Sequence, residues 1–194
     1  MKVLIDNGHA KNSVNKSPDG KVIEGTWARD MAKRLYVRLA QVGIPAHILV
    51  PEDEDIKLSE RAKRANQVAK KEPCILVSIH NDASGSDGKW HDPSGWSVFV
   101  SLNASGNSKA LASMMAASAE EYKLKVRRPD PLHGYWQKNL AICRDTSCPA
   151  VLVENLFQDN KEDAKYLQSE EGQVVLCEVM VEGICNYLGV QYSN

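Results

Sequence analysis

Two histidines and two glutamates have the types and positions that metal-dependent hydrolysis requires. His9 and His80 each follow an apolar run of the chain, Glu24 opens a helical pattern, and Glu154 follows a later apolar run. A catalytic zinc site commonly takes two histidines and one carboxylate and leaves a fourth position for water. A further carboxylate beside that water acts as general base and then returns the proton to the leaving amine. The sequence therefore predicts one Zn²⁺ per chain held by His9, Glu24 and His80, with Glu154 as the base.

Each of these residues also has an ordinary structural explanation when taken alone. A histidine at the end of a strand often serves a structural hydrogen bond. A glutamate in the first turn of a helix, such as Glu24, interacts favourably with the helix dipole. The hypothesis of a metal site therefore depends on the joint placement of the four residues.

The elements that position these residues alternate between strands and helices. Short apolar runs predict strands at residues 3–5, 46–50, 74–79, 96–102, 140–143 and 150–153. Apolar stripes at helical spacing predict helices at residues 24–42, 59–71, 107–124 and 172–188. This alternation predicts an α/β fold, a twisted, mostly parallel or mixed sheet with helices on both faces. Because functional groups in such sheets gather at the carboxyl ends of the strands, we expect the four residues to meet there.

Four segments share the order and composition of the motifs of one family. They are Asp6-Asn7-Gly8-His9, Glu24 with the helix after it, Ser78-Ile79-His80, and the segment from Pro149 to Phe157 that contains Glu154. Together they resemble the zinc-dependent N-acetylmuramoyl-L-alanine amidases of the amidase-3 type, over nearly the whole chain. The chain departs from the family's pattern at Ala10, where glycine is common, and at Asn81-Asp82-Ala83, where x-Asn-Ala is commoner.

The resemblance implies hydrolysis of the amide that joins N-acetylmuramic acid to L-alanine in peptidoglycan, as in cell-wall lytic enzymes and endolysins. Two alternatives stay open. One is a zinc carboxypeptidase or another amide hydrolase, which differs in its products. The other is a protein that binds peptidoglycan without cutting it, which has no need of a base such as Glu154. Division-associated relatives carry a helix that covers the zinc, but loops 82–95 and 125–139 show no apolar helical stripe, so we expect an open site.

Length and composition limit the remaining possibilities. The chain has 194 residues, which suits a single catalytic amidase domain over 1–194, without a cell-wall-binding module. A formal net charge of −1 argues against a nucleic-acid partner. No apolar run approaches the roughly 20 residues of a membrane span, and no signal peptide is visible. We therefore expect a monomer that is made in the cytoplasm, reaches the wall by release or another export route, and acts there on peptidoglycan or muropeptides.

A few further residues attract attention by their type. Trp90 and Trp136 are candidates for stacking against sugar or peptide in the substrate. Cys143 and Cys148 flank a turn-like segment and are the cysteines best placed to meet, although the odd number of five cysteines favours reduced thiols.

Overall fold

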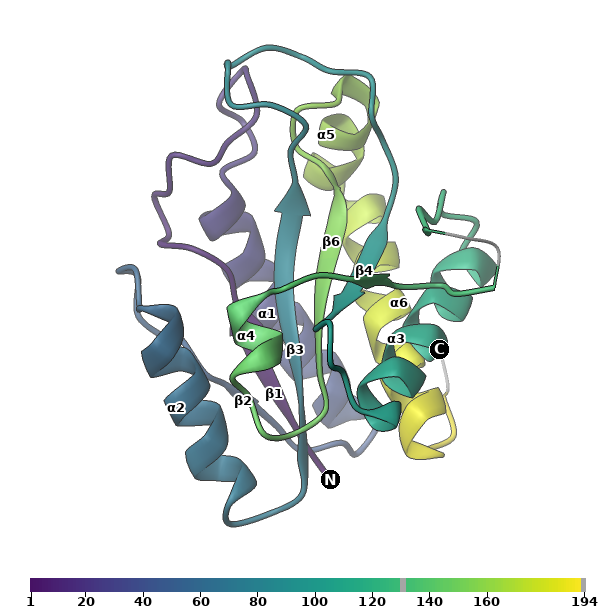
Figure 1. Cartoon of the computed structure of the whole chain (residues 1–194). Coiled ribbons are helices and arrows are strands. Elements are labelled where there is room, and N and C mark those ends of the chain that lie inside the picture. Colours follow the sequence, from purple (N-terminus) through teal and green to yellow (C-terminus); the bar gives the residue numbers. More distant parts are fainter. Residues whose placement is uncertain (130–131, 193–194) are drawn as a thin grey trace.

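Six strands form one mixed sheet in the computed structural model, which describes residues 1–129 and 132–192 (Figure 1). They are β1 (Lys2–Asn7), β2 (Ala46–Ile48), β3 (Cys74–Asp82), β4 (Ser97–Val100), β5 (Trp136–Gln137) and β6 (Ala150–Phe157). Their order across the sheet is β2-β1-β3-β6-β4-β5. β2, β1, β3 and β6 run parallel, β4 runs antiparallel to β6, and β5 is parallel to β4. The predicted mixed sheet is thus confirmed.

Helices cover both faces of this sheet (Figure 1). One face carries α1 (Glu24–Gln41), α3 (Gly106–Glu121), α5 (Lys161–Gln168) and α6 (Glu170–Leu188), and the other carries α2 (Leu58–Ala69) and α4 (Ala141–Arg144). Within β1, Val3 and Ile5 face the first layer and Leu4 faces the second, and all three are buried. A strand buried on both faces explains the continuous apolar runs of the sequence.

The predicted strand at 140–143 is wrong. Residues Ala141–Arg144 form the helical turn α4, because the Leu140 carbonyl accepts hydrogen bonds from the backbone N–H groups of Cys143 and Arg144. Ile142 and Cys143 pack into the core on the α2 side of the sheet. A short apolar run can serve a buried helical turn as well as a strand, and periodicity does not separate the two. The edge strand is instead β5, and α5 was not predicted.

The last parallel strand is longer than predicted. β6 continues through Glu154 to Phe157, so Glu154 lies within the strand and not after it. Leu156 has a positive φ of 67° near the place where the register of β3 and β6 shifts. The pairing of β3 with β6 thus continues past Glu154 with a shift in register.

All five cysteines are free thiols in the structure. Cys143 and Cys148 do not pair with each other. Cys148 instead contacts Cys74, which lies in the same core cluster.

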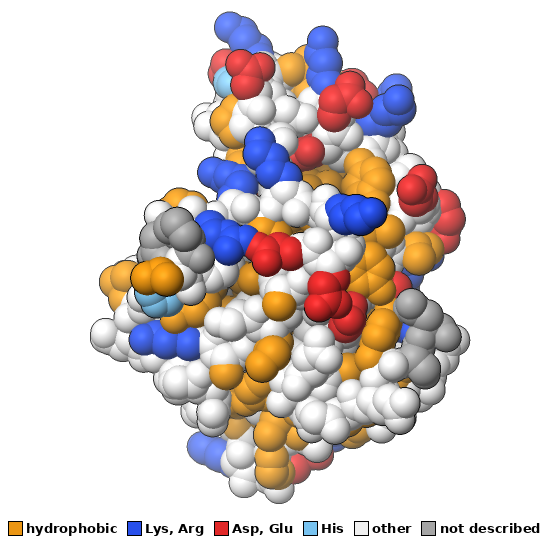
Figure 2. Space-filling model, turned by 90° about the vertical axis from the view of Figure 1, so that its right-hand side faces the viewer, with side chains coloured by type: hydrophobic (Ala, Val, Ile, Leu, Met, Phe, Trp, Pro, Cys, Tyr) orange, Lys and Arg blue, Asp and Glu red, His pale blue; other side chains and the backbone are white. Residues whose placement is uncertain are grey.

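None of the helices within the described ranges combines the length and the apolar character needed to cross a lipid bilayer. Basic and acidic side chains are interspersed on the face that Figure 2 shows, in line with the small net charge.

Candidate metal centre

The first predicted ligand, His9, lies just beyond the carboxyl end of β1. Its backbone has a φ of 57°, the left-handed region that residues other than glycine rarely adopt. This turn directs the imidazole back over the sheet edge, where Nε2 lies 3.3 Å from Glu24 Oε1. Asn15 Nδ2 lies 3.1 Å from the same nitrogen.

The second predicted ligand, Glu24, is the first residue of α1. The residue is 3% exposed, so its carboxylate needs partners. Oε1 lies 3.0 Å from His80 Nδ1 and accepts a hydrogen bond of 3.2 Å from the Asn81 backbone N–H. The start of the first helix is therefore held against the end of β3.

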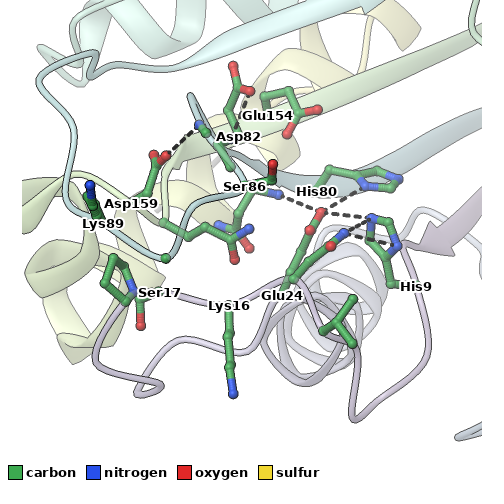
Figure 3. Close-up of a pocket in the computed structure, with 18 residues that line it drawn as sticks. His9, Lys16, Ser17, Glu24, His80, Asp82, Ser86, Lys89, Glu154 and Asp159 are labelled. Atoms are coloured by element: carbon green, nitrogen blue, oxygen red, sulfur yellow. Dashed lines mark hydrogen bonds and ion pairs between the residues drawn. The ribbon is translucent and has the colours of Figure 1, made fainter.

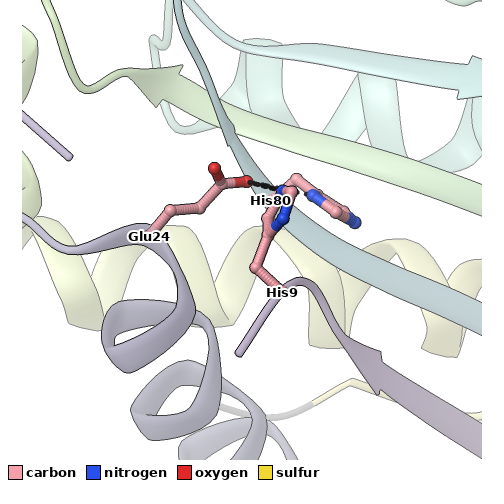
Figure 4. A group of neighbouring side chains, drawn as sticks. All are labelled: His9, Glu24 and His80. Atoms are coloured by element: carbon pink, nitrogen blue, oxygen red, sulfur yellow. Dashed lines mark hydrogen bonds and ion pairs between the residues drawn. The ribbon is translucent and has the colours of Figure 1, made fainter. Parts of the chain in front are cut away.

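The third predicted ligand, His80, lies within β3 and meets the other two (Figure 4). The rings of His9 and His80 are 5.2 Å apart and nearly perpendicular. Gly8 makes this approach possible, because a Cβ at that position would lie 2.3 Å from His80 Cε1. Gly8 thus belongs to the site through its lack of a side chain.

The predicted base, Glu154, is the register partner of His80 in the pairing of β3 with β6. Its Oε2 atom is buried and has no hydrogen-bond partner within residues 1–129 and 132–192. The metal triad, defined as His9, Glu24 and His80, and Glu154 line one cavity of about 520 Å³. The structure therefore brings together all four residues that the sequence singles out.

The cavity extends well beyond the triad. Figure 3 shows Glu154 and Asp82 beside the triad and Asp159 and Lys89 toward the other end. Asp82, Lys89 and Asp159 were not predicted as site residues. Asp82 ends β3 and Asp159 follows β6, so the rule that functional groups gather at the carboxyl ends of strands was the available signal.

Burial and neighbouring charges shift the pKa values of these groups. Burial by itself would raise the pKa of Glu24, but hydrogen bonds with His80 and His9 outweigh it and lower this pKa to about 2. The hydrogen bond with Glu24 raises the pKa of His9. Burial raises the pKa of Glu154 well above its ordinary value, and the negative charges of Asp82 and Glu24 raise it further. A carboxylate with a raised pKa is a better proton acceptor, which suits a base.

The donor set fits a divalent metal ion. The ligand atoms of His9, Glu24 and His80 all lie within 4.8 Å of one another. Two imidazoles and one carboxylate are the donors that zinc takes at catalytic sites. The unpartnered oxygen of Glu154, which lies in the same cavity, is the kind of group that a bound water would satisfy. These three residues form a candidate metal site.

The two tryptophan candidates lie outside the lining of this cavity. Trp136 lies in β5, where its ring stacks on Phe99 and its Nε1 donates to the Arg127 carbonyl. Trp90 packs against the core and borders a separate surface groove with Lys161 and Lys165. Their contact with substrate stays a prediction.

Neither loop between β3 and β6 places a helix over the triad, within the part of each loop that the structure describes. Residues 83–95 form bends and irregular backbone, and residues 125–129 and 132–135 contain only isolated bridges, bends and one turn. The 83–95 loop is held at its ends, since Asp159 accepts hydrogen bonds from Ser84 and Gly85 and Asp163 accepts one from Gly95. The expected open site is in keeping with this arrangement.

Known proteins resemble this chain in sequence and in structure. The endolysin of Bacillus phage SPP1 is 25% identical over 197 residues, which cover 99% of this chain and 68% of the endolysin. The probable cell wall amidase LytH of Staphylococcus aureus is 25% identical over 187 residues, 95% of this chain and 57% of that protein. The structure of an N-acetylmuramoyl-L-alanine amidase from Clostridium difficile 630 matches with a TM-score of 0.84 and 26% identity, over 99% of this chain and 98% of that one.

The extent of these matches differs between the relatives. The chain spans little more than half of LytH, at 57%, but nearly the whole of the clostridial structure, at 98%. The family model described as N-acetylmuramoyl-L-alanine amidase matches residues 3–186. This range includes the metal triad and Glu154, and the chain therefore belongs to the N-acetylmuramoyl-L-alanine amidase family.

Proposed function

We propose that this chain is a zinc-dependent hydrolase that cuts the amide bond between N-acetylmuramic acid and L-alanine in peptidoglycan. The observation that carries the proposal is the register pairing of His80 with Glu154, which sets a proposed metal ligand beside a carboxyl group of raised pKa in one cavity. Membership of the amidase family supports the choice of substrate.

His9, Glu24 and His80 would hold one Zn²⁺ ion. When bound, zinc lowers the pKa of a water and polarises a carbonyl oxygen. Because its pKa is about 2, Glu24 is ionised at neutral pH and is available there as a carboxylate ligand. The left-handed turn at His9 and the absence of a side chain at Gly8 let the His9 imidazole, from the loop after β1, approach the His80 imidazole on β3.

Glu154 moves the proton in this proposal. Its carboxylate takes a proton from water as the water oxygen adds to the lactyl carbonyl carbon. The carbon–nitrogen bond then breaks, and Glu154 gives the proton to the departing alanine nitrogen. The products are a lactyl carboxylic acid on the glycan and a stem peptide with a free amine, and the acid then ionises as the amine takes up its proton. Atoms and charge balance without a covalent enzyme intermediate.

We also propose that the chain works as a monomer on the cell wall and needs no activator to expose its site. The support is the open cavity, over which the described parts of loops 82–95 and 125–139 place no helix. The endolysin relative favours a lytic role for the chain.

Mass spectrometry of purified peptidoglycan tests the function directly. We expect the protein to release stem peptides with a free L-alanine amine from an intact glycan, and a chelator to abolish the release. Products cut within the stem peptide would identify a peptidase instead. Binding of peptidoglycan without any release, by protein that contains zinc, would identify a binding protein.

A further inference from the structure

The conformation of His9 requires an explanation. Its φ of 57° is one that an L-residue with a side chain adopts at a cost in free energy. Such a conformation persists only where the surrounding contacts determine it. The imidazole of His9 contacts Glu24 and Asn15, and the backbone carbonyl of His9 has a separate partner in Arg29.

Three consecutive carbonyl groups, those of residues 9, 10 and 11, lie against the first two turns of α1. The His9 carbonyl accepts a hydrogen bond of 2.8 Å from Arg29 Nη1, and the Lys11 carbonyl accepts one of 2.6 Å from Thr26 Oγ1. Between them, the Ala10 carbonyl oxygen would lie 1.7 Å from a Cβ at Gly25, so the helix and the loop touch closely. We call these contacts the loop clamp.

The loop clamp joins two metal ligands through one helix. Glu24 opens α1, and the second turn of the same helix contacts the backbone of His9 through Arg29. The relative position of His9 and Glu24 is thereby set by backbone contacts that do not involve their ligand atoms. His80 reaches them from a separate element, β3 (Figure 4).

Arg29 is the central residue of the loop clamp. It is 7% exposed, and its guanidinium donates to three carbonyl oxygens. Nη1 donates to His9 and Gly25, and Nε and Nη2 both donate to Glu52. Its nearest carboxylate, that of Asp53, is 4.0 Å away and largely exposed. The planar fork of an arginine can serve three carbonyls at once, which a lysine ammonium on its flexible stem cannot do with the same geometry.

We propose that Arg29, assisted by Thr26, is a positioning residue that sets the affinity of the metal centre by holding His9 in its left-handed conformation. Arg29 acts through the backbone of His9 and touches neither the ligand atoms nor the cavity. The proposal rests on the metal site of the proposed function. It differs from a purely structural role, in which Arg29 would stabilise the fold and leave the affinity of the folded protein for zinc unchanged.

The test is the zinc dissociation constant, measured by competition with a chromogenic chelator on protein whose folding is checked by circular dichroism. We expect Arg29→Met to weaken zinc binding by about 10- to 100-fold, the usual effect of removing a partner that orients a metal ligand. Arg29→Lys should recover part of this loss. Arg34→Met is the matched control on the same helix, because Arg34 pairs with the exposed Glu170 and should leave the affinity unchanged.

A second variant keeps the test decisive if Arg29→Met does not fold. Thr26→Val keeps the shape of the side chain and removes only the hydrogen bond to Lys11, so we expect a loss of affinity of several-fold. Wild-type zinc affinity in folded Arg29→Met, or in Thr26→Val when Arg29→Met is unfolded, would overturn the proposal. Failure of the unmodified protein to bind zinc would instead overturn the proposed function.

Discussion

The carboxyl edge of the sheet and the interface between α3 and α6 differ in the kind of group that they bury. At the sheet edge, Glu154 Oε2 and Asp159 Oδ1 are buried without a hydrogen-bond partner among the described residues, and negative charges gather there. Between α3 and α6 the packing is apolar and close, and Gly183 lets α6 approach the backbone of Met115. Where α3 does bury a polar side chain without a partner, at Ser118, it is a neutral hydroxyl.

The difference indicates which region is built for chemistry and which for stability. Natural proteins break the rules of packing and polar satisfaction mainly at functional sites. Changes at the sheet edge should therefore alter metal binding or turnover and have little effect on stability. Changes between α3 and α6 should alter stability and leave the turnover of each folded molecule as it is. Substitutions in each of the two regions test this separation.

The largest effect is expected for His80→Ala. Loss of one of three ligands should remove bound zinc and reduce hydrolysis to background, which metal analysis and peptide release will measure on the same sample. His91→Ala is the control, because His91 pairs with Asp87 outside the triad and should keep about one zinc per chain. Full zinc occupancy in His80→Ala would remove His80 from the ligand set.

Glu154→Gln should separate the base from the ligands. The variant keeps all three ligands and should keep its zinc, but its turnover should fall by about 10²- to 10⁴-fold, the usual contribution of a positioned general base. Its stability should not fall, because an uncharged amide replaces a buried carboxyl beside Asp82 and Glu24. Zinc loss in this variant would make Glu154 a ligand, and unchanged turnover would exclude it as the base.

The sequence singles out His9, Glu24, His80 and Glu154 because the signals that mark them are local. His9, His80 and Glu154 each stand at or near the end of an apolar run, and the α/β pattern brings such ends to one edge. The structure adds what depends on tertiary contacts. The register that pairs His80 with Glu154, the left-handed turn at His9 and the buried hydrogen bonds of Arg29 join segments far apart in the chain.

The errors in the predicted fold have the same origin, in tertiary contacts that the local sequence does not show. The apolar composition of residues 140–143 indicates burial but does not show what these residues pack against, and the run therefore predicted a strand. The helical turn there is selected by packing against the α2 side of the sheet. Helix α5 is short and polar, and its start depends on Asn160, whose side chain accepts hydrogen bonds from the N–H groups of Glu162 and Asp163. Capping of this kind is a sequence signal that was available.

Gly183→Ala tests the stability side of the comparison. In an open helix this change would stabilise the protein by about 0.5 to 1 kcal/mol. Here the new Cβ would lie 2.7 Å from the Met115 Cα, a backbone atom that cannot move aside cheaply. We expect a net loss of about 1 to 3 kcal/mol in the free energy of unfolding by urea, with unchanged turnover per folded molecule. Gly106→Ala, where nothing lies within 4 Å, is the control and should lose no stability.

The smallest effect is expected where α3 and α6 meet water, at Glu121 and Glu182. Burial raises the pKa of Glu182 above its ordinary value of 4.5, and the charge of Glu121 and a hydrogen bond with it raise this pKa further. A carboxyl whose pKa is higher in the folded state than in the unfolded state favours folding while it is protonated. That contribution is complete below pH 4.5 and is lost as the pH rises through the folded-state value.

Glu182→Gln removes this titration, so its unfolding free energy should fall less than that of the unmodified protein between pH 4.5 and neutral pH. At neutral pH the variant should be slightly the more stable, by less than the Gly183→Ala effect, because Glu121 is exposed and salt screens its repulsion of the half-buried Glu182. Glu121→Gln should give a similar gain, and the double variant should add little, since both changes remove one repulsion. Urea unfolding at several pH values measures all three. If Glu182→Gln is less stable than the unmodified protein at neutral pH, the negative charge of Glu182 stabilises the fold. The separation between a sheet edge built for chemistry and a purely structural interface of α3 with α6 would then fail.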